Sequence, residues 1–158
     1  MRHIISVILE NEAGALSRVA GLFSARGFNI ESLTVAATTD STLSRMTIVS
    51  LGDDGIIEQI VKQLDKLIDV VKVVDLTATE HIERELLLAK ISISSDTQAD
   101  VEAKLDQFNA KIIDAAEEAY TVELAGKSQK IKDFLGVFNA EQIIEISRTG
   151  VTGVCQKI

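Results

Sequence analysis

The sequence predicts an α+β protein of two consecutive domains, each with the element order βαββαβ. Short runs rich in β-branched residues alternate with segments whose apolar residues recur at helical spacing. This order of elements occurs twice along 158 residues, a length that suits two domains of about 80 residues each. Apolar residues make up 46% of the chain and charged residues 25%, as in ordinary globular proteins.

The first predicted domain covers residues 1–78. Its expected elements are a strand at 4–9, a helix with Leu16, Val19, Ala20 and Phe23 on its apolar face, strands at 29–37 and 43–51, a helix with Ile57, Ile60, Val61, Leu64 and Leu67 on one face, and a strand at 70–76. Gly27 stands where a helix C-terminal cap is expected, and Asp53 and Asp54 are expected to cap the second helix. The polar turn at 38–42 predicts an antiparallel hairpin.

The second predicted domain covers residues 79–158 and repeats this order. Its expected elements are a strand at 86–94, a helix with Val101, Leu105 and Phe108, strands at 111–116 and 120–125, a helix with Ile131, Phe134, Leu135 and Phe138, and a strand at 143–146. Ser95 and Gln98 have the spacing of a capping box. A short tail at 148–158 has no predicted structure. Both domains are therefore predicted to be ferredoxin-like, with one sheet face bare and sheet edges open to pairing.

The charge and composition exclude several functional classes. The net charge is −8, and residues 1–78 (−3) and 79–158 (−5) are both acidic, so no basic surface for nucleic acid is expected. The single cysteine, Cys155, allows no intrachain disulfide and no cysteine zinc cluster, which fits a reducing compartment. No apolar stretch approaches about 20 residues, so no membrane span is expected.

No catalytic or metal-binding residues are predicted. The histidines are His3, on the first strand, and His81, between the domains, and neither belongs to a recognisable catalytic or metal motif. His3 is expected to be a surface or packed imidazole, and His81 to be solvated. An enzyme of ferredoxin-like fold that uses carboxylates is the alternative from a different functional class, and turnover of pyruvate by the isolated chain would support it.

The loop that joins the first strand to the first helix has the composition of a small-ligand site. Backbone N–H groups and the helix dipole at such a junction attract anions, and Gly14 allows close approach to the backbone. Asn11 can both donate and accept hydrogen bonds, so a small amphoteric ligand with a carboxylate suits the loop. The alternative is that Asn11 and Gly14 make a turn and cap a helix.

Two runs of residues carry a resemblance to a known family. Residues 9–19 read Leu-Glu-Asn-Glu-Ala-Gly-Ala-Leu-Ser-Arg-Val, and residues 23–35 include Gly-Phe-Asn-Ile-Glu-Ser-Leu. Together with Leu-Ser-Arg-Met-Thr at 43–47 and, more loosely, Arg-Thr-Gly at 148–150, they closely resemble the regulatory (small) subunits of acetohydroxyacid synthase, also called acetolactate synthase. The first 75 or so residues resemble that family's ACT domain. The second half is similar to the family in layout and length, but looser in sequence.

The resemblance implies a regulatory and non-catalytic role. Such subunits bind the large catalytic subunit, raise its activity and confer feedback inhibition by a branched-chain amino acid, usually valine, in valine and isoleucine biosynthesis. Thiamine diphosphate, Mg²⁺ and FAD are then expected on the catalytic subunit and no cofactor on this chain. A homodimer through the ACT domains and a cytoplasmic location are also expected.

The resemblance further implies where the effector binds. The site is expected between two subunits, with the loop at 11–14 from one and the strand start near Asn29 from the other. The residues expected to bind the effector are Asn11, Ala13, Gly14, Ala15, Leu16, Asn29 and Ile30. Valine, leucine and isoleucine remain open as ligands. The alternative function is a free-standing amino-acid sensor of ACT type with a different partner.

Overall fold

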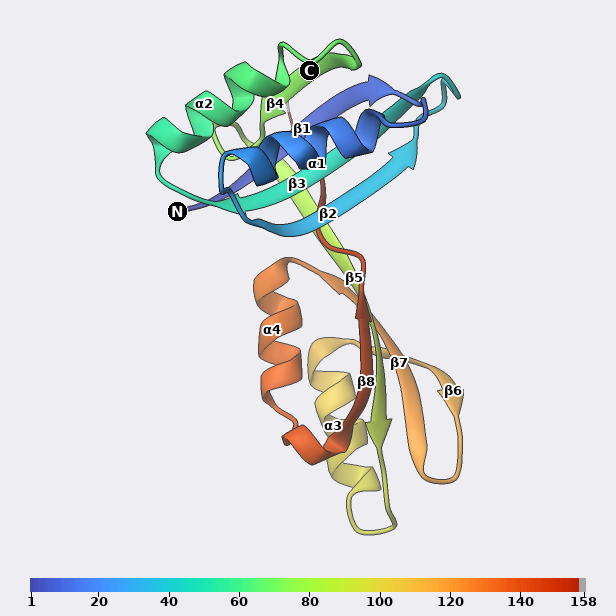
Figure 1. The fold of residues 1–158 in the computed structure, drawn as a ribbon. Helices are drawn as coiled ribbons and strands as arrows, with labels where there is room; N and C mark the ends of the chain where they lie inside the picture. The colour runs from blue at the N-terminus through green and yellow to red at the C-terminus, as the bar shows by residue number, and fades with distance from the viewer. Residues whose placement is uncertain (157–158) are drawn as a thin grey trace. The chain divides into compact units, whose positions relative to one another are not determined.

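A computed structural model describes residues 1–156 of the chain (Figure 1). Residues 1–83 and 151–156 pack as one unit, and residues 84–150 pack as another. The division after Glu83 falls close to the predicted boundary at 78. Of the predicted tail at 148–158, residues 148–150 belong to the second unit, whereas residues 151–156 pack with the first.

The first unit has the predicted βαββαβ order. Its elements are β1 (Arg2–Glu10), α1 (Ala15–Ala25), β2 (Ile30–Ala37), β3 (Leu43–Leu51), α2 (Asp54–Leu64) and β4 (Val70–Asp75). The strands form an antiparallel sheet in the order β2-β3-β1-β4, and the predicted hairpin is the β2–β3 pair. Figure 1 shows α1 and α2 on the same face of this sheet. The predicted ferredoxin-like fold is confirmed.

Every second side chain of β1 points into the core of the first unit. Ile5, Val7 and Leu9 are buried in the cluster that also contains the inward residues of both helices. The buried residues of α1 are Ala15, Val19 and Phe23. The prediction that Leu16 lies on the buried face was therefore wrong. Residues four apart share a helix face, so burial of Ala15 turns Leu16 toward solvent, where it is 42% exposed.

Two of the predicted helix caps are present. The side chain of Asp53 accepts a hydrogen bond of 2.8 Å from the backbone N–H of Ile56, as expected for an N-cap. Asp54 is the first residue of α2 and not its cap. Gly27, just after the end of α1, has a φ of 69°, a left-handed conformation that glycine adopts without strain.

The second unit repeats the fold. Its elements are β5 (His81–Ser92), α3 (Gln98–Phe108), β6 (Lys111–Ala115), β7 (Ala119–Gly126), α4 (Ser128–Gly136), a 3₁₀ turn (Ala140–Gln142) and β8 (Ile143–Arg148). The first three residues of β5 belong to the first unit. The strand order is β6-β7-β5-β8. The predicted capping box is wrong: Thr97 is the N-cap residue of α3, and its hydroxyl oxygen accepts from the Ser94 N–H. The Gln98 side chain contacts Tyr120 and Glu102 instead.

The tail forms an unpredicted strand, β9 (Thr152–Cys155), which pairs with β5. Val151, which is 2% exposed, packs with Ile4, Val49 and Leu76 in a cluster separate from the core beneath the helices. Gly153 lies so close to this cluster that a Cβ there would stand 2.8 Å from Leu76 Cδ1. The chain's own tail therefore covers part of the sheet face that was expected to be bare.

Candidate functional site

The loop between β1 and α1 is held by the turn that joins β2 to β3. The backbone N–H of Asn11 donates to the carbonyl of Thr42 at 2.7 Å, and its side-chain Nδ2 donates to the carbonyl of Ser41 at 3.0 Å. Both bonds use nitrogen donors, so Oδ1 is the acceptor that the exposed Asn11 side chain can offer a ligand. Asn11 is therefore both a structural residue of the turn and a candidate ligand contact.

Gly14 gives the start of α1 its geometry. It is the N-cap residue, with φ of 90° and ψ of −13°, a left-handed conformation that disfavours side chains with a Cβ. No side chain among the described residues caps this helix end. The N–H of Ala15 donates to the carbonyl of Glu12 at 3.3 Å. Leu16 and Ser17 therefore carry the N–H groups suited to binding an anion such as a carboxylate.

The remaining loop residues can contribute in different ways. Ala13 and Gly14 are exposed, and Leu16 is exposed on the first turn of the helix. Ala15 is 2% exposed with its methyl group in the core, so it can offer a ligand only its backbone. The loop thus combines polar backbone groups with one accessible apolar side chain.

Asn29 and Ile30 lie at the other end of the same sheet. Ile30 pairs with Ser50, and Ser50 pairs with His3, whereas the loop follows Glu10, which pairs with Leu43. Seven residue steps along β1 separate His3 from Glu10, which is about 24 Å at 3.4 Å per residue. Within one chain, the structure therefore does not bring the two parts of the predicted site together.

Asn29 is nevertheless oriented by local hydrogen bonds. Its Nδ2 donates to Glu31 Oε1 at 2.6 Å, and its backbone carbonyl accepts from the Ser50 hydroxyl at 2.7 Å. The side chain is exposed, and its Oδ1 can accept a hydrogen bond from an ammonium group.

Sequence reasoning missed an ion pair beside the loop. Arg18 Nη2 donates to Asp69 Oδ1 at 2.7 Å, and Arg18 Nε donates to the other carboxylate oxygen. The same guanidinium lies against Gly14, where a Cβ would stand 2.9 Å from Nη1. A cation in the first turn of a helix opposes the helix dipole, and this was the one signal that could have pointed to an acidic partner.

The two histidines lie away from this loop. His3 is 4% exposed and packed at the start of β1. His81 opens β5, half-buried, with Nδ1 2.9 Å from the carbonyl oxygen of Thr79. Within residues 1–156, no group of three or more histidine, cysteine, aspartate or glutamate side chains is arranged to hold a metal ion. No helix in the same range is long and apolar enough to cross a membrane.

Comparison with known proteins adds an independent line of evidence. Residues 5–72 match a family model described as an AHAS small subunit-like ACT domain, and residues 84–157 match one described as the small subunit of acetolactate synthase. The acetolactate synthase isozyme 3 small subunit of Escherichia coli (strain K12) is 52% identical over 155 residues, which cover 98% of this chain and 95% of that protein. The acetolactate synthase small subunit of Haemophilus influenzae is 51% identical over 155 residues, which again cover 98% of this chain and 95% of that protein.

The fold comparison agrees with the sequence comparison. The crystal structure of the acetolactate synthase small subunit from Thermotoga maritima superposes with a TM-score of 0.90 at 37% identity. The match covers 99% of this chain and 98% of that chain, so the likeness extends over both units.

Proposed function

The chain belongs to the acetolactate synthase small-subunit family, and from that premise we propose that it regulates a larger catalytic subunit by binding a branched-chain amino acid. The observation that carries the proposal is that the residues predicted to bind the effector lie at the two ends of one sheet. A site divided in this way is complete only where a second copy supplies the missing half.

The edge strand β2 offers a way to join the two halves. It is terminal in the sheet order, and several of its side chains are exposed. If two copies pair antiparallel through β2, the start of one strand lies beside the end of the other. The end of β2 adjoins the turn that holds Asn11, so Asn29 of one copy then approaches the loop at 11–16 of its partner.

The assembled site suits a small aliphatic amino acid. The carboxylate is held by the N-terminus of α1, and the ammonium group donates to the Oδ1 of Asn29. Leu16 and Ile30 provide apolar contacts from the two copies. Complete burial of a valine side chain contributes about 1.5–3 kcal/mol, so the polar contacts must supply the rest of the affinity.

Catalysis is assigned to the partner. The relatives are named as small subunits, which implies a larger partner in the complex. In our proposal that partner carries thiamine diphosphate, Mg²⁺ and FAD and forms acetolactate in the cytoplasm, while this chain raises its activity and holds no cofactor. Valine is the preferred effector in the proposal.

The test is acetolactate formation by the purified large subunit with and without this chain, across added valine, leucine and isoleucine. The proposal expects higher activity with the chain, inhibition by at least one of the three amino acids, and no turnover by the chain alone. No binding of the large subunit in a pull-down would favour a free-standing amino-acid sensor with another partner. Turnover by the chain alone would favour a carboxylate enzyme.

A further inference from the structure

A cavity of about 480 Å³ lies in the first unit, at the end of β1 opposite the loop at 11–16. Its walls come from one side of α2, the start of β1, and the end of β4 with the segment that follows it. Ile57 and Val61 form part of an apolar wall, and His3, Asp54 and Asp75 form a polar one. None of the residues assigned to the proposed effector site lines it.

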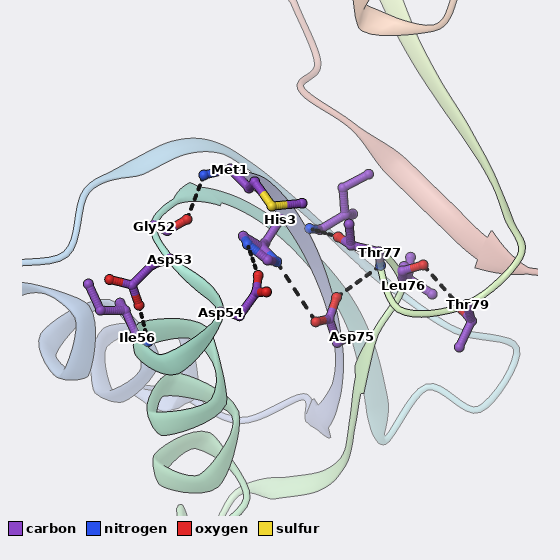
Figure 2. Close-up of polar contacts among 11 residues, drawn as sticks. Met1, His3, Gly52, Asp53, Asp54, Ile56, Asp75, Leu76, Thr77 and Thr79 are labelled. Atoms are coloured by element: carbon purple, nitrogen blue, oxygen red, sulfur yellow. Dashed lines mark hydrogen bonds and ion pairs between the residues drawn. The ribbon is translucent and has the colours of Figure 1, made fainter.

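His3 is the residue in this cavity that needs an explanation. It is 4% exposed, and both of its ring nitrogens are buried without a hydrogen-bond partner among the described residues. Figure 2 shows each ring nitrogen facing a carboxylate, with Nε2 3.5 Å from Asp54 Oδ1 and Nδ1 3.9 Å from Asp75 Oδ2. These distances are too long for hydrogen bonds, and a buried polar group without a partner is unfavourable.

The carboxylates make the cavity negatively charged. Asp75 uses Oδ1 to accept from the Thr77 N–H at 2.9 Å, and its Oδ2 faces the imidazole (Figure 2). Glu58, also in the wall, is paired with Lys62 at 2.6 Å, so these two charges offset each other. The amino group of Met1 donates to the carbonyl of Gly52 at 2.7 Å and is the other cation at this rim. Two aspartates and one terminal ammonium leave an excess of negative charge.

The geometry therefore favours a cation over an anion, and an organic cation over a metal ion. The carboxylates of Asp54 and Asp75 offer acceptor oxygens to a ligand in the cavity. A primary ammonium group has three N–H donors. The adjacent apolar wall suits a hydrocarbon chain attached to that group. No metal-holding set of side chains is found within residues 1–156.

We propose that this cavity binds a small alkylammonium compound. Its ammonium group donates to the carboxylates of Asp54 and Asp75 beside the His3 ring, while its hydrocarbon part packs against Ile57 and Val61. This site shares no residue with the proposed effector site and does not depend on the regulatory function.

The test uses the full chain and n-butylammonium chloride as the probe. The chain contains two histidines, so the ring proton signals of His3 and His81 can be assigned by NMR from His3→Gln and His81→Gln variants. At about pH 8, where an alkylammonium is charged, a titration at constant ionic strength is expected to shift the His3 signals saturably and leave those of His81 unchanged. Sodium butyrate and n-butanol at the same concentrations are expected to produce no saturable shift.

Two substitutions, one at each end of α2, distinguish binding at this cavity from a general attraction of the cationic probe to an acidic protein. Asp54→Asn removes a carboxylate from the cavity, and its side chain is 82% exposed, so the fold is expected to persist. It is expected to weaken binding of the probe about five- to tenfold, the effect of losing one charge near 4 Å where water screens it as strongly as at this exposed carboxylate. Asp65→Asn removes the same charge at the far end of α2, outside the cavity, and is expected to leave the affinity unchanged.

Three results would overturn the proposal. The first is the absence of a saturable shift of the His3 signals, which would mean that water alone satisfies the ring. The second is an equal response to n-butanol. The third is an equal loss of affinity in Asp54→Asn and Asp65→Asn, which would mean that the probe responds only to the net charge.

Discussion

Arg18 donates to both carboxylate oxygens of Asp69, so the first turn of α1 is tied to the loop that precedes β4. Asp69 is 5% exposed, and its side chain is engaged on both oxygens. The hydrogen bonds from Arg18 lower the pKa of the Asp69 carboxyl, and those to Asp69 raise the pKa of Arg18. Because the same guanidinium lies against Gly14, this ion pair also positions the loop of the proposed effector site.

The ion pair predicts a pH dependence of stability. The pKa of the Asp69 carboxyl is lower in the folded state than in the unfolded state. The ion pair therefore contributes fully to the free energy of unfolding above the unfolded-state pKa of about 3.9, and this contribution is lost as the pH falls through the folded-state pKa. Asp69→Asn is therefore expected to lower the melting temperature at pH 7 and to show less further loss in acid than the parent chain. The check is melting temperature against pH, with the exposed Asp65→Asn as a matched control. Parallel curves for Asp69→Asn and the parent would contradict the account.

Gly14→Asp is expected to abolish the response to valine and to lower stability. The left-handed conformation at Gly14 costs a residue with a Cβ about 1–2 kcal/mol, and Arg18 must also move from the position of that Cβ. The new carboxylate competes with that of the ligand for the same N–H groups. Repulsion between two charges at ~4 Å is about 4 kcal/mol at an effective dielectric near 20, although the Arg18 guanidinium offsets part of it.

Gly14→Asn is the matched control for strain. Asparagine tolerates the left-handed conformation better than most residues and adds no charge. Valine affinity, measured calorimetrically, is expected to fall further in the aspartate variant than in the asparagine variant. Equal affinities in the two variants would mean that the ligand carboxylate does not lie near Gly14.

The tail is expected to stabilise the first unit and not the second. A chain ending at Gly150 lacks Val151, which is buried against Ile4 and Leu76. Loss of that side chain from the cluster is expected to destabilise the first unit by about 1–3 kcal/mol. Hydrogen exchange is the check: amides of β1 are expected to lose protection, while amides of β7 keep theirs. Unchanged protection in β1 would show that the tail contributes nothing to the first unit.

Dimerisation through β2 predicts different effects of charge at the two sheet edges. Val35 on β2 is 42% exposed and Val71 on β4 is 59% exposed. Val35→Lys is expected to shift the full chain toward monomer in sedimentation, because it places like charges at the proposed contact. Val71→Lys lies at the opposite edge of the sheet and is expected to remain a dimer. The reverse pattern would place the contact at β4.

Local signals were sufficient for most of the fold. The predicted bounds of β3, Leu43 to Leu51, match the structure because a polar turn and a glycine enclose a run of strand-forming residues. Asp53 was recognisable as a cap from its position before an amphipathic helix. Strand β5 begins five residues before its predicted start, because its first residues pair with β9, which lies far along the chain.

Long-range partners explain what sequence reasoning missed. Nothing local identifies a four-residue strand such as β9 or the use of Val151 to cover Ile4. Arg18 and Asp69 are 51 residues apart, so their pairing depends on the fold. The loop at 11–14 could be singled out from the sequence because glycine and asparagine at a strand-to-helix junction carry their own chemistry, and its effector-binding role stays a prediction.

Complementation between two variants of the chain tests the shared effector site most directly. Asn11→Ala and Asn29→Ala each remove one half of both sites, so neither variant alone is expected to bind valine with measurable affinity. When the two are unfolded together and refolded as an equal mixture, about half of the dimers combine one of each, and each such dimer has one intact site. The account predicts that calorimetry on the mixture recovers valine binding of parental affinity at about a quarter of the parental stoichiometry. No recovery, with dimers of normal size, would contradict a site shared between two copies.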